Sequence, residues 1–195
     1  MNLEALADSE QILQRTPRVI VIDDDPAVVD VVEKLLTTYG YQVECFHSAE
    51  KMLATAGLDD IGCVITDLQM PGMTGIALQY RLKELNSCLA VIVITGHADV
   101  PRAVEIMSLG AAMLLEKPFK NSELLEEVKN AIELSQQAMV KRQRIQAAVR
   151  RVSKLDEEEL QIMLCAARGL PNKAIASQLA LSPWTVDRRR QSALL

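Results

Sequence analysis

The feature that most constrains the fold is an alternation of two hydrophobic periods between residue 18 and about residue 121. Short runs rich in β-branched residues, which favour strands, alternate with longer stretches whose apolar residues recur every three or four positions, as in amphipathic helices. The short runs are apolar at successive positions, as expected of parallel strands that helices cover on both faces. The pattern therefore predicts five βα units around a parallel sheet.

Glycine, proline and aspartate mark the joints of this repeat. We expect strands at residues 19–22, 42–46, 63–66, 90–95 and 112–115. Helices are expected from residue 26 to a stop at Gly40, at 49–56, 76–85 and 100–109, and from residue 123 onward.

The helical pattern that starts after residue 122 contains no glycine or proline before Gly169, and its charge changes sign along the way. Glutamates give way to a basic stretch that comprises Lys141, Arg142, Arg144, Arg150, Arg151 and Lys154. We interpret this stretch as a solvated linker helix in preference to a nucleic-acid site. The predicted domains are an N-terminal extension (1–17), a βα domain (18–138), a linker helix (139–154) and a small all-α domain (155–195).

Capping signals divide the last 41 residues into three short helices. Asp156 and Glu159 have the spacing of an N-cap and its capping box. Asn172 is expected to cap the second helix, and Ser182 with Pro183 to start the third. Two short helices joined by a tight turn are typical of a helix-turn-helix.

The overall composition excludes several classes of protein. A net charge of −5 and a pI near 5.2 argue against a wholly basic nucleic-acid binder. The four cysteines form no C-x-x-C pair, so neither a disulfide framework nor a zinc site is indicated. The first 17 residues lack a basic start followed by an apolar run, so no signal peptide is expected, and no run of 18 apolar residues occurs. We therefore expect a soluble, cytoplasmic protein with no membrane partner.

Polar residues follow four of the five expected strands at their carboxyl ends. They are Asp23, Asp24 and Asp25 after the first strand, Asp67 after the third, Thr95 after the fourth and Lys117 after the fifth. The carboxyl ends of parallel strands meet at one edge, so these side chains are expected to share a pocket. Clustered carboxylates favour a divalent cation, and a carboxylate beside Mg²⁺ and lysine can attack a phosphoryl group. Asp67 is the best nucleophile, whereas Asp25 could be only an N-cap before Pro26.

Four stretches of the βα domain carry a more specific signal: VIVIDDDPAVV, VITDLQMPGMTG, VIVITGHADVPRAVEIMSLGA and LLEKPF. Together they resemble the receiver domain of bacterial two-component response regulators, FixJ-type members in particular. The resemblance implies a flavodoxin-like sheet in the order 2-1-3-4-5 and a sensor histidine kinase as partner.

Carried over to this sequence, the resemblance implies that Asp67 accepts a phosphoryl group from that kinase. Mg²⁺ (or Mn²⁺) would be held by Asp67, by Asp24 directly, by Asp23 partly through water and by the main-chain carbonyl of Gln69. Asp25 would stand outside the metal's coordination shell. No enzymatic activity is expected beyond self-catalysed transfer to Asp67 and slow autodephosphorylation.

The family's switch residues are matched with one departure. Thr95 and Lys117 would bind the phosphoryl oxygens, and the Lys117–Pro118 peptide bond would be cis. Receivers often carry an aromatic residue three positions before the lysine, where this chain has Leu114, so the switch is expected to depend on Thr95 alone. His97 is expected to be an exposed loop residue without a catalytic role.

The segment LPNKAIASQLALSPWTVDRRR resembles the LuxR/GerE-type helix-turn-helix of the same regulators. The resemblance implies binding to double-stranded promoter DNA with the third helix in the major groove. The residues expected to contact DNA are Asn172, Lys173, Thr185, Val186, Arg188, Arg189 and Arg190. Trp184 stands where relatives commonly carry arginine. The family's domain continues into a fourth helix for packing and dimerisation, which this chain, stopping at Leu195, is expected to lack.

Three functions remain open from the sequence. The first is a transcription regulator that forms a homodimer when phosphorylated and so frees its helix-turn-helix. The second is a phosphoreceiver that acts through protein–protein contacts without DNA. The third is a phosphatase of the haloacid dehalogenase type, whose D-x-D signature is formally present as Asp23 and Asp25. That signature expects threonine at position 27, where this chain has alanine, and it leaves Asp67 without a role.

Overall fold

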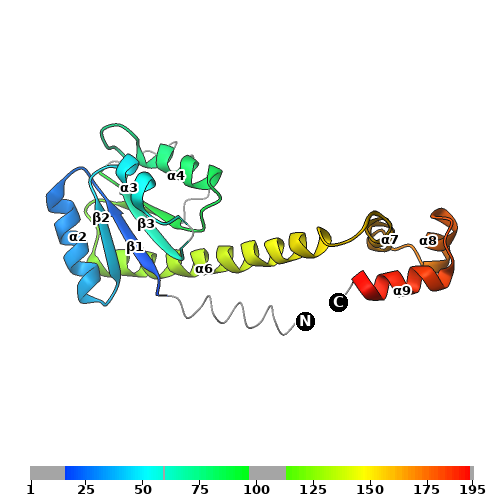
Figure 1. Cartoon of the computed structure of the whole chain (residues 1–195). Coiled ribbons are helices and arrows are strands. Elements are labelled where there is room, and N and C mark those ends of the chain that lie inside the picture. Colours follow the sequence, from blue (N-terminus) through cyan, green and yellow to red (C-terminus); the bar gives the residue numbers. More distant parts are fainter. Residues whose placement is uncertain (1–15, 59, 97–112, 194–195) are drawn as a thin grey trace. The chain divides into compact units, whose positions relative to one another are not determined.

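The structure, a computed structural model, describes residues 16–58, 60–96 and 113–193. The chain divides into two compact units, unit 1 (Met1–Arg142) and unit 2 (Gln143–Leu195). Figure 1 shows the strands of unit 1 and the short helices at the carboxyl end of the chain. Each unit is described on its own below.

Unit 1 is built on a five-stranded parallel sheet. Its strands are β1 (Arg18–Ile22), β2 (Gln42–Phe46), β3 (Gly62–Asp67), β4 (Ala90–Thr95) and β5 (Met113–Glu116). They lie in the order β2-β1-β3-β4-β5, which confirms the predicted flavodoxin-like topology. The register pairs Ile22 with Thr66 and Asp67 with Ile94, so the carboxyl ends of β1, β3 and β4 lie at one edge.

Helices cover both faces of this sheet (Figure 1). They are α2 (Pro26–Thr38), α3 (Ala49–Thr55), α4 (Gly75–Glu84) and α6 (Asn121–Val152). A hydrophobic core lies on each face of the sheet. Alternate residues of each strand belong to different cores, because successive side chains of a strand point to opposite faces. Ile20 packs with residues of α3 and α4, whereas Val19 and Val21 pack with residues of α2 and α6. The helix predicted at 100–109 lies outside the described residues.

Local capping explains where the described helices begin. Asp25 is the N-cap of α2 and accepts a hydrogen bond from the Ala27 amide at 2.9 Å, as expected if it is a turn residue. The helix predicted from residue 123 begins at Asn121 and continues without interruption to Val152. The predicted linker helix is therefore the continuation of the last helix of unit 1. No described helix is long and apolar enough to span a membrane.

Unit 2 contains three short helices, α7 (Glu157–Ala167), α8 (Asn172–Gln178) and α9 (Pro183–Ala193). Both hydrogen bonds of the predicted capping box are present, because the Glu159 amide donates to Asp156 at 2.7 Å and the Asp156 amide donates to Glu159 at 3.2 Å. The prediction that Asn172 caps α8 is wrong: the N-cap is Pro171, and the Asn172 side chain faces α9 instead. The small core consists of Ile162, Cys165, Ile175, Ala176 and Val186.

Candidate functional site

Four polar residues that are far apart in the sequence meet at the carboxyl edge of the sheet. Asp67 and Thr95 are the last residues of β3 and β4, and Asp23 and Lys117 directly follow β1 and β5. The Lys117 amide donates to the Thr95 carbonyl at 2.8 Å, which continues the β4–β5 pairing up to the lysine. Parallel pairing alone therefore brings two carboxylates, a hydroxyl and an ammonium together.

The ammonium of Lys117 bridges the two carboxylates. Its Nζ lies 2.8 Å from Oδ2 of Asp67 and 3.3 Å from Oδ2 of Asp23. Burial raises the pKa of Asp23, which is only 5% exposed, and the amide of Asp25 and the charge of Lys117 oppose that rise without cancelling it. Burial alone would lower the pKa of Lys117, but its contacts with Asp67 and Asp23 outweigh this effect and the net shift is upward. The lysine is therefore firmly charged.

Backbone amides hold the other oxygen of each carboxylate. The Gln69 amide donates to Oδ1 of Asp67 and the Asp25 amide donates to Oδ1 of Asp23, both at 2.9 Å. Each carboxylate is thus fixed by one amide through Oδ1 and by Lys117 through Oδ2, so both are oriented toward the same end of the lysine. The site is pre-organised for an electrophile or cation there.

The donor atoms around the site fit a hard divalent cation. Asp23, Asp67 and the exposed Asp24 provide three carboxylates, but Lys117 provides only one compensating charge. Among the described residues, no group of three or more His, Cys, Asp or Glu side chains gathers tightly enough to form an all-protein metal site. Mg²⁺ is commonly held by one or two carboxylates and keeps several waters, and Asp23 and Asp67 provide two carboxylates at this site.

The residues predicted to contact DNA lie on α8 and α9 and fall into two groups, according to whether their side chains are held inside unit 2 or face outward. Val186 is fully buried in the small core. Arg189 lies 2.5 Å from Asp156 and 3.0 Å from Glu158, and Arg190 donates to the Asn172 amide oxygen. These contacts bind α9 to α7 and α8.

The outward group comprises the remaining candidates. Lys173 and Arg188 are exposed and Thr185 is half-buried. Thr185 also shares a hydrogen bond of 2.8 Å with the Ser182 hydroxyl at the start of α9. Among the described residues, Val186 is buried and Asn172, Arg189 and Arg190 contact another helix of unit 2, whereas Lys173, Thr185 and Arg188 are not held by another helix in this way.

Both units match known families. Residues 19–129 match the response regulator receiver domain, and residues 153–194 match the bacterial regulatory proteins of the luxR family. The transcriptional regulatory protein FixJ of Bradyrhizobium diazoefficiens is 39% identical over 177 residues, which cover 90% of this chain and 86% of FixJ. This chain belongs to the family of two-component response regulators. Its receiver and its LuxR-type DNA-binding domain make it a transcriptional regulator that is phosphorylated on an aspartate.

Further relatives of this response regulator cover nearly its whole length. The response regulator protein TodT of Pseudomonas putida (strain F1) is 34% identical over 180 residues, which cover 92% of this chain and 79% of TodT. A solved structure of the response regulator StyR superposes with a TM-score of 0.76 at 33% identity and covers 92% of this chain and 91% of that one. The full-length FixJ structure from B. japonicum gives a TM-score of 0.59 at 36% identity, with 93% and 89% covered.

Sequence reasoning missed one residue that positions the site of the regulator. The carboxylate of Glu50, at the start of α3, accepts a hydrogen bond of 2.8 Å from the Met73 amide in the loop between β3 and α4. A Cβ atom on Gly72 would lie 2.6 Å from the same carboxylate oxygen. Glu50 of α3 therefore restrains the loop that follows Asp67. No local signal marks Glu50, since its partner lies 23 residues away.

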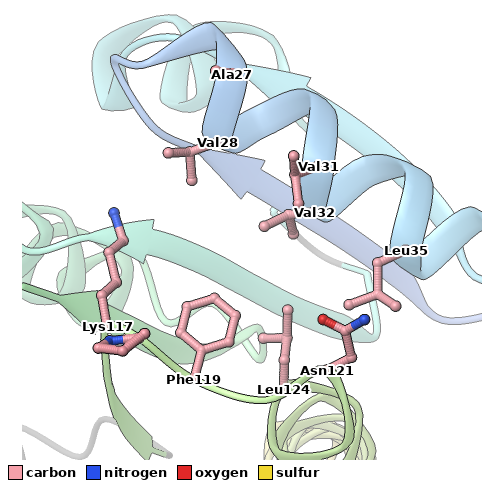
Figure 2. Close-up of a pocket in the computed structure, with 10 residues that line it drawn as sticks. Ala27, Val28, Val31, Val32, Leu35, Lys117, Phe119, Asn121 and Leu124 are labelled. Atoms are coloured by element: carbon pink, nitrogen blue, oxygen red, sulfur yellow. The ribbon is translucent and has the colours of Figure 1, made fainter.

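An apolar hollow of about 390 Å³ lies beside Lys117 in the receiver. Figure 2 shows the side chains of α2, including Val28, Val31 and Val32, on one side of it and Phe119 and Leu124 on the other. Lys117 lies at one end. Val31 is 65% exposed, so this wall offers apolar surface to a partner.

Two further expectations concern the switch. The Lys117–Pro118 peptide bond is cis, as predicted. Leu114 is half-buried and packs against the core that contains Ile20 and Val93, where an aromatic side chain is common in the family. His97 lies outside the described residues.

Proposed function

We propose that Asp67 is the phosphoacceptor of this regulator and that a sensor histidine kinase supplies the phosphoryl group. The observation that carries the proposal is the bridge from Lys117 to both Asp67 and Asp23. In this arrangement a nucleophilic carboxylate faces a fixed cation and a second carboxylate that can hold a metal. Asp25, the second acid of the phosphatase alternative, caps α2 instead.

In the proposed transfer, an Asp67 oxygen bonds to phosphorus as the bond from phosphorus to the kinase histidine breaks. The Lys117 ammonium then pairs with a phosphoryl oxygen in place of the carboxylate, and the buried Thr95 hydroxyl binds another. Asp23, Asp24, Asp67 and the Gln69 carbonyl would hold Mg²⁺. When bound, Mg²⁺ supplies the positive charge that offsets the phosphoryl oxygens.

The apolar hollow beside Lys117 supports a protein as the phosphodonor. Lys117, which pairs with Asp67, also lines the hollow, so a protein that covers the exposed Val31 and its neighbours on α2 would lie next to the phosphoacceptor site. Burial of apolar side chains is the main favourable term in most protein association. A histidine-containing kinase domain with an apolar face fits this surface.

We further propose that phosphorylation acts through Thr95 and β5, promotes a homodimer and frees unit 2 to bind promoter DNA. With Leu114 in place of an aromatic, movement of Thr95 toward the phosphoryl group is the switching event. Lys173, Thr185 and Arg188 are the proposed contacts with DNA. A phosphoreceiver that works through protein–protein contacts alone is the alternative.

Two experiments test these proposals. Phosphorylation by acetyl phosphate with Mg²⁺, measured by a mobility shift on a phosphate-binding gel, is expected for the parent and lost in Asp67→Asn. Asp25→Asn is the matched control, because asparagine also caps helices and the substitution leaves unchanged the main-chain amide by which Asp25 contacts Asp23. Undiminished labelling of Asp67→Asn contradicts the assignment. DNA binding whose affinity falls steeply with salt supports the regulator, and absence of binding supports the protein–protein alternative.

A further inference from the structure

The most exposed large apolar side chain among the described residues belongs to Trp184, the second residue of α9, and 69% of it is accessible. It is also the sole tryptophan of the chain. Tryptophan combines a large apolar surface with few rotatable bonds and is enriched at the energetic centres of interfaces. Trp184 stands at the start of the helix that carries two of the three proposed DNA contacts, Thr185 and Arg188.

A second observation concerns the partner of this ring. The guanidinium carbon of Arg188 lies 5.5 Å from the centre of the Trp184 ring, one helical turn further along α9. This spacing lets the side chains meet on the helix surface, and the contact is a cation–π interaction. The guanidinium stacked in this way keeps its N–H groups at its rim, where they are free to donate to a ligand.

The other two arginines of α9 are used differently. Arg189 pairs with Asp156 and Glu158 of the α7 start, and Arg190 donates to Asn172 of α8. Within Pro183–Ala193, Arg188 is therefore the arginine that no acid or amide holds against the unit. The cation and the indole form one exposed surface on α9.

We propose that Trp184 and Arg188 together read the base sequence of the target DNA, an inference that rests on the proposed DNA binding. The Arg188 guanidinium donates two hydrogen bonds to a guanine edge, and the Trp184 indole packs against the methyl group of a nearby thymine. One helical turn advances about 5.4 Å, while base pairs are spaced about 3.4 Å apart. The two residues therefore reach adjacent or next-adjacent base pairs, and each half-site contains a guanine within one or two base pairs of a thymine.

The test uses the full chain, phosphorylated with acetyl phosphate and Mg²⁺, and a pool of duplexes randomised over about 20 base pairs, enough for two half-sites one turn apart. After selection, acrylamide quenching of the single tryptophan is measured with and without the enriched duplex. Affinities are then compared for the parent, Trp184→Ala, Arg188→Ala and the control Arg168→Ala. Arg168 is an exposed arginine that ends α7, so its loss removes the same charge elsewhere.

We expect the enriched duplex to protect the tryptophan from acrylamide. Trp184→Ala and Arg188→Ala should each weaken binding to it about tenfold or more, while Arg168→Ala changes it little. Replacing the guanine should abolish the effect of Arg188→Ala but not that of Trp184→Ala. If a duplex is enriched yet the tryptophan stays accessible and Trp184→Ala binds like the parent, the assignment of this pair is overturned while DNA binding stands. If no duplex is enriched, the DNA-binding proposal fails and this inference fails with it.

Discussion

Replacing Lys117 with methionine is the sharpest test of the receiver site. Methionine preserves much of the apolar stem but removes the ammonium that lies between Asp67 and Asp23. Asp23 is then left buried beside a second carboxylate without its compensating charge. We expect Lys117→Met to destabilise unit 1 at neutral pH in the absence of divalent cations.

The magnitude follows from the two contacts. A hydrogen bond to a charged group contributes about 1.5–3 kcal/mol when buried. The Lys117 side chain is 29% exposed and one of its contacts is 3.3 Å long, so solvent screening reduces both contributions. We therefore expect the variant to lose about 1–3 kcal/mol of the free energy of unfolding.

The loss should depend on pH with a definite sign. The pKa of Asp23 is raised in the folded protein, so protonation of Asp23 favours folding, and this contribution is lost as pH rises through the folded-state pKa. Lys117 opposes that rise, so its removal raises the pKa of Asp23 further. The deficit of the variant is therefore largest near neutral pH and shrinks as the pH falls toward 3.8, the usual value of the group.

Urea unfolding, followed by near-ultraviolet circular dichroism of the tyrosines, measures this loss, because all three tyrosines (Tyr39, Tyr41, Tyr80) lie in unit 1. Lys51→Met, on the exposed face of α3, is the control for losing a surface charge. Saturating Mg²⁺ should stabilise Lys117→Met more than the parent, because the ion relieves the excess negative charge. A deficit that is the same at all pH values and with Mg²⁺ would refute the electrostatic reasoning and indicate lost packing instead.

Three other substitutions test separate parts of the structure. Gly75→Ala places a Cβ atom 2.5 Å from the Asp67 carbonyl oxygen, so we expect phosphorylation by acetyl phosphate to slow severalfold even where the variant stays folded by circular dichroism. Ala180 has a φ of 55°, so Ala180→Gly should raise the free energy of unfolding of unit 2 by about 1 kcal/mol in a tryptophan-monitored urea titration; a decrease would contradict the strain argument. Val186→Ala should lower the free energy of unfolding of unit 2 by about 2 kcal/mol in the same titration, because it removes two buried methyl groups from a small core. An unchanged unfolding midpoint would show that this core does not stabilise the unit.

The local pattern of residues predicted most of the architecture. The β-branched runs and helical periods depend on residues close together in the sequence, and they predicted the five parallel strands that the sheet contains. The order of these strands and the two domain families followed from the resemblance to response regulators, and both are confirmed. The roles of Asp25 and Asp156 were equally predictable, because an N-cap bonds to amides two or three residues away. The coming together of Asp23, Asp67 and Lys117 followed from parallel topology, although the phosphoryl transfer assigned to them stays a prediction.

Other features depended on contacts between residues far apart in the chain. Glu50 holds the loop after Asp67, and Arg189 pairs with acids about 30 residues before it, without any mark in the neighbouring sequence. Val186 and Asn172 were expected at DNA, yet one is in the core and the other is bonded to Asp187 at 3.1 Å. The sequence by itself determined which segments form strands and helices, and the caps of α2 and α7, since those depend on residues within one or two turns. Only the tertiary structure decided which polar side chains of α9 are held inside unit 2 and which, like Arg188, stay exposed, because that depends on which elements pack against each face.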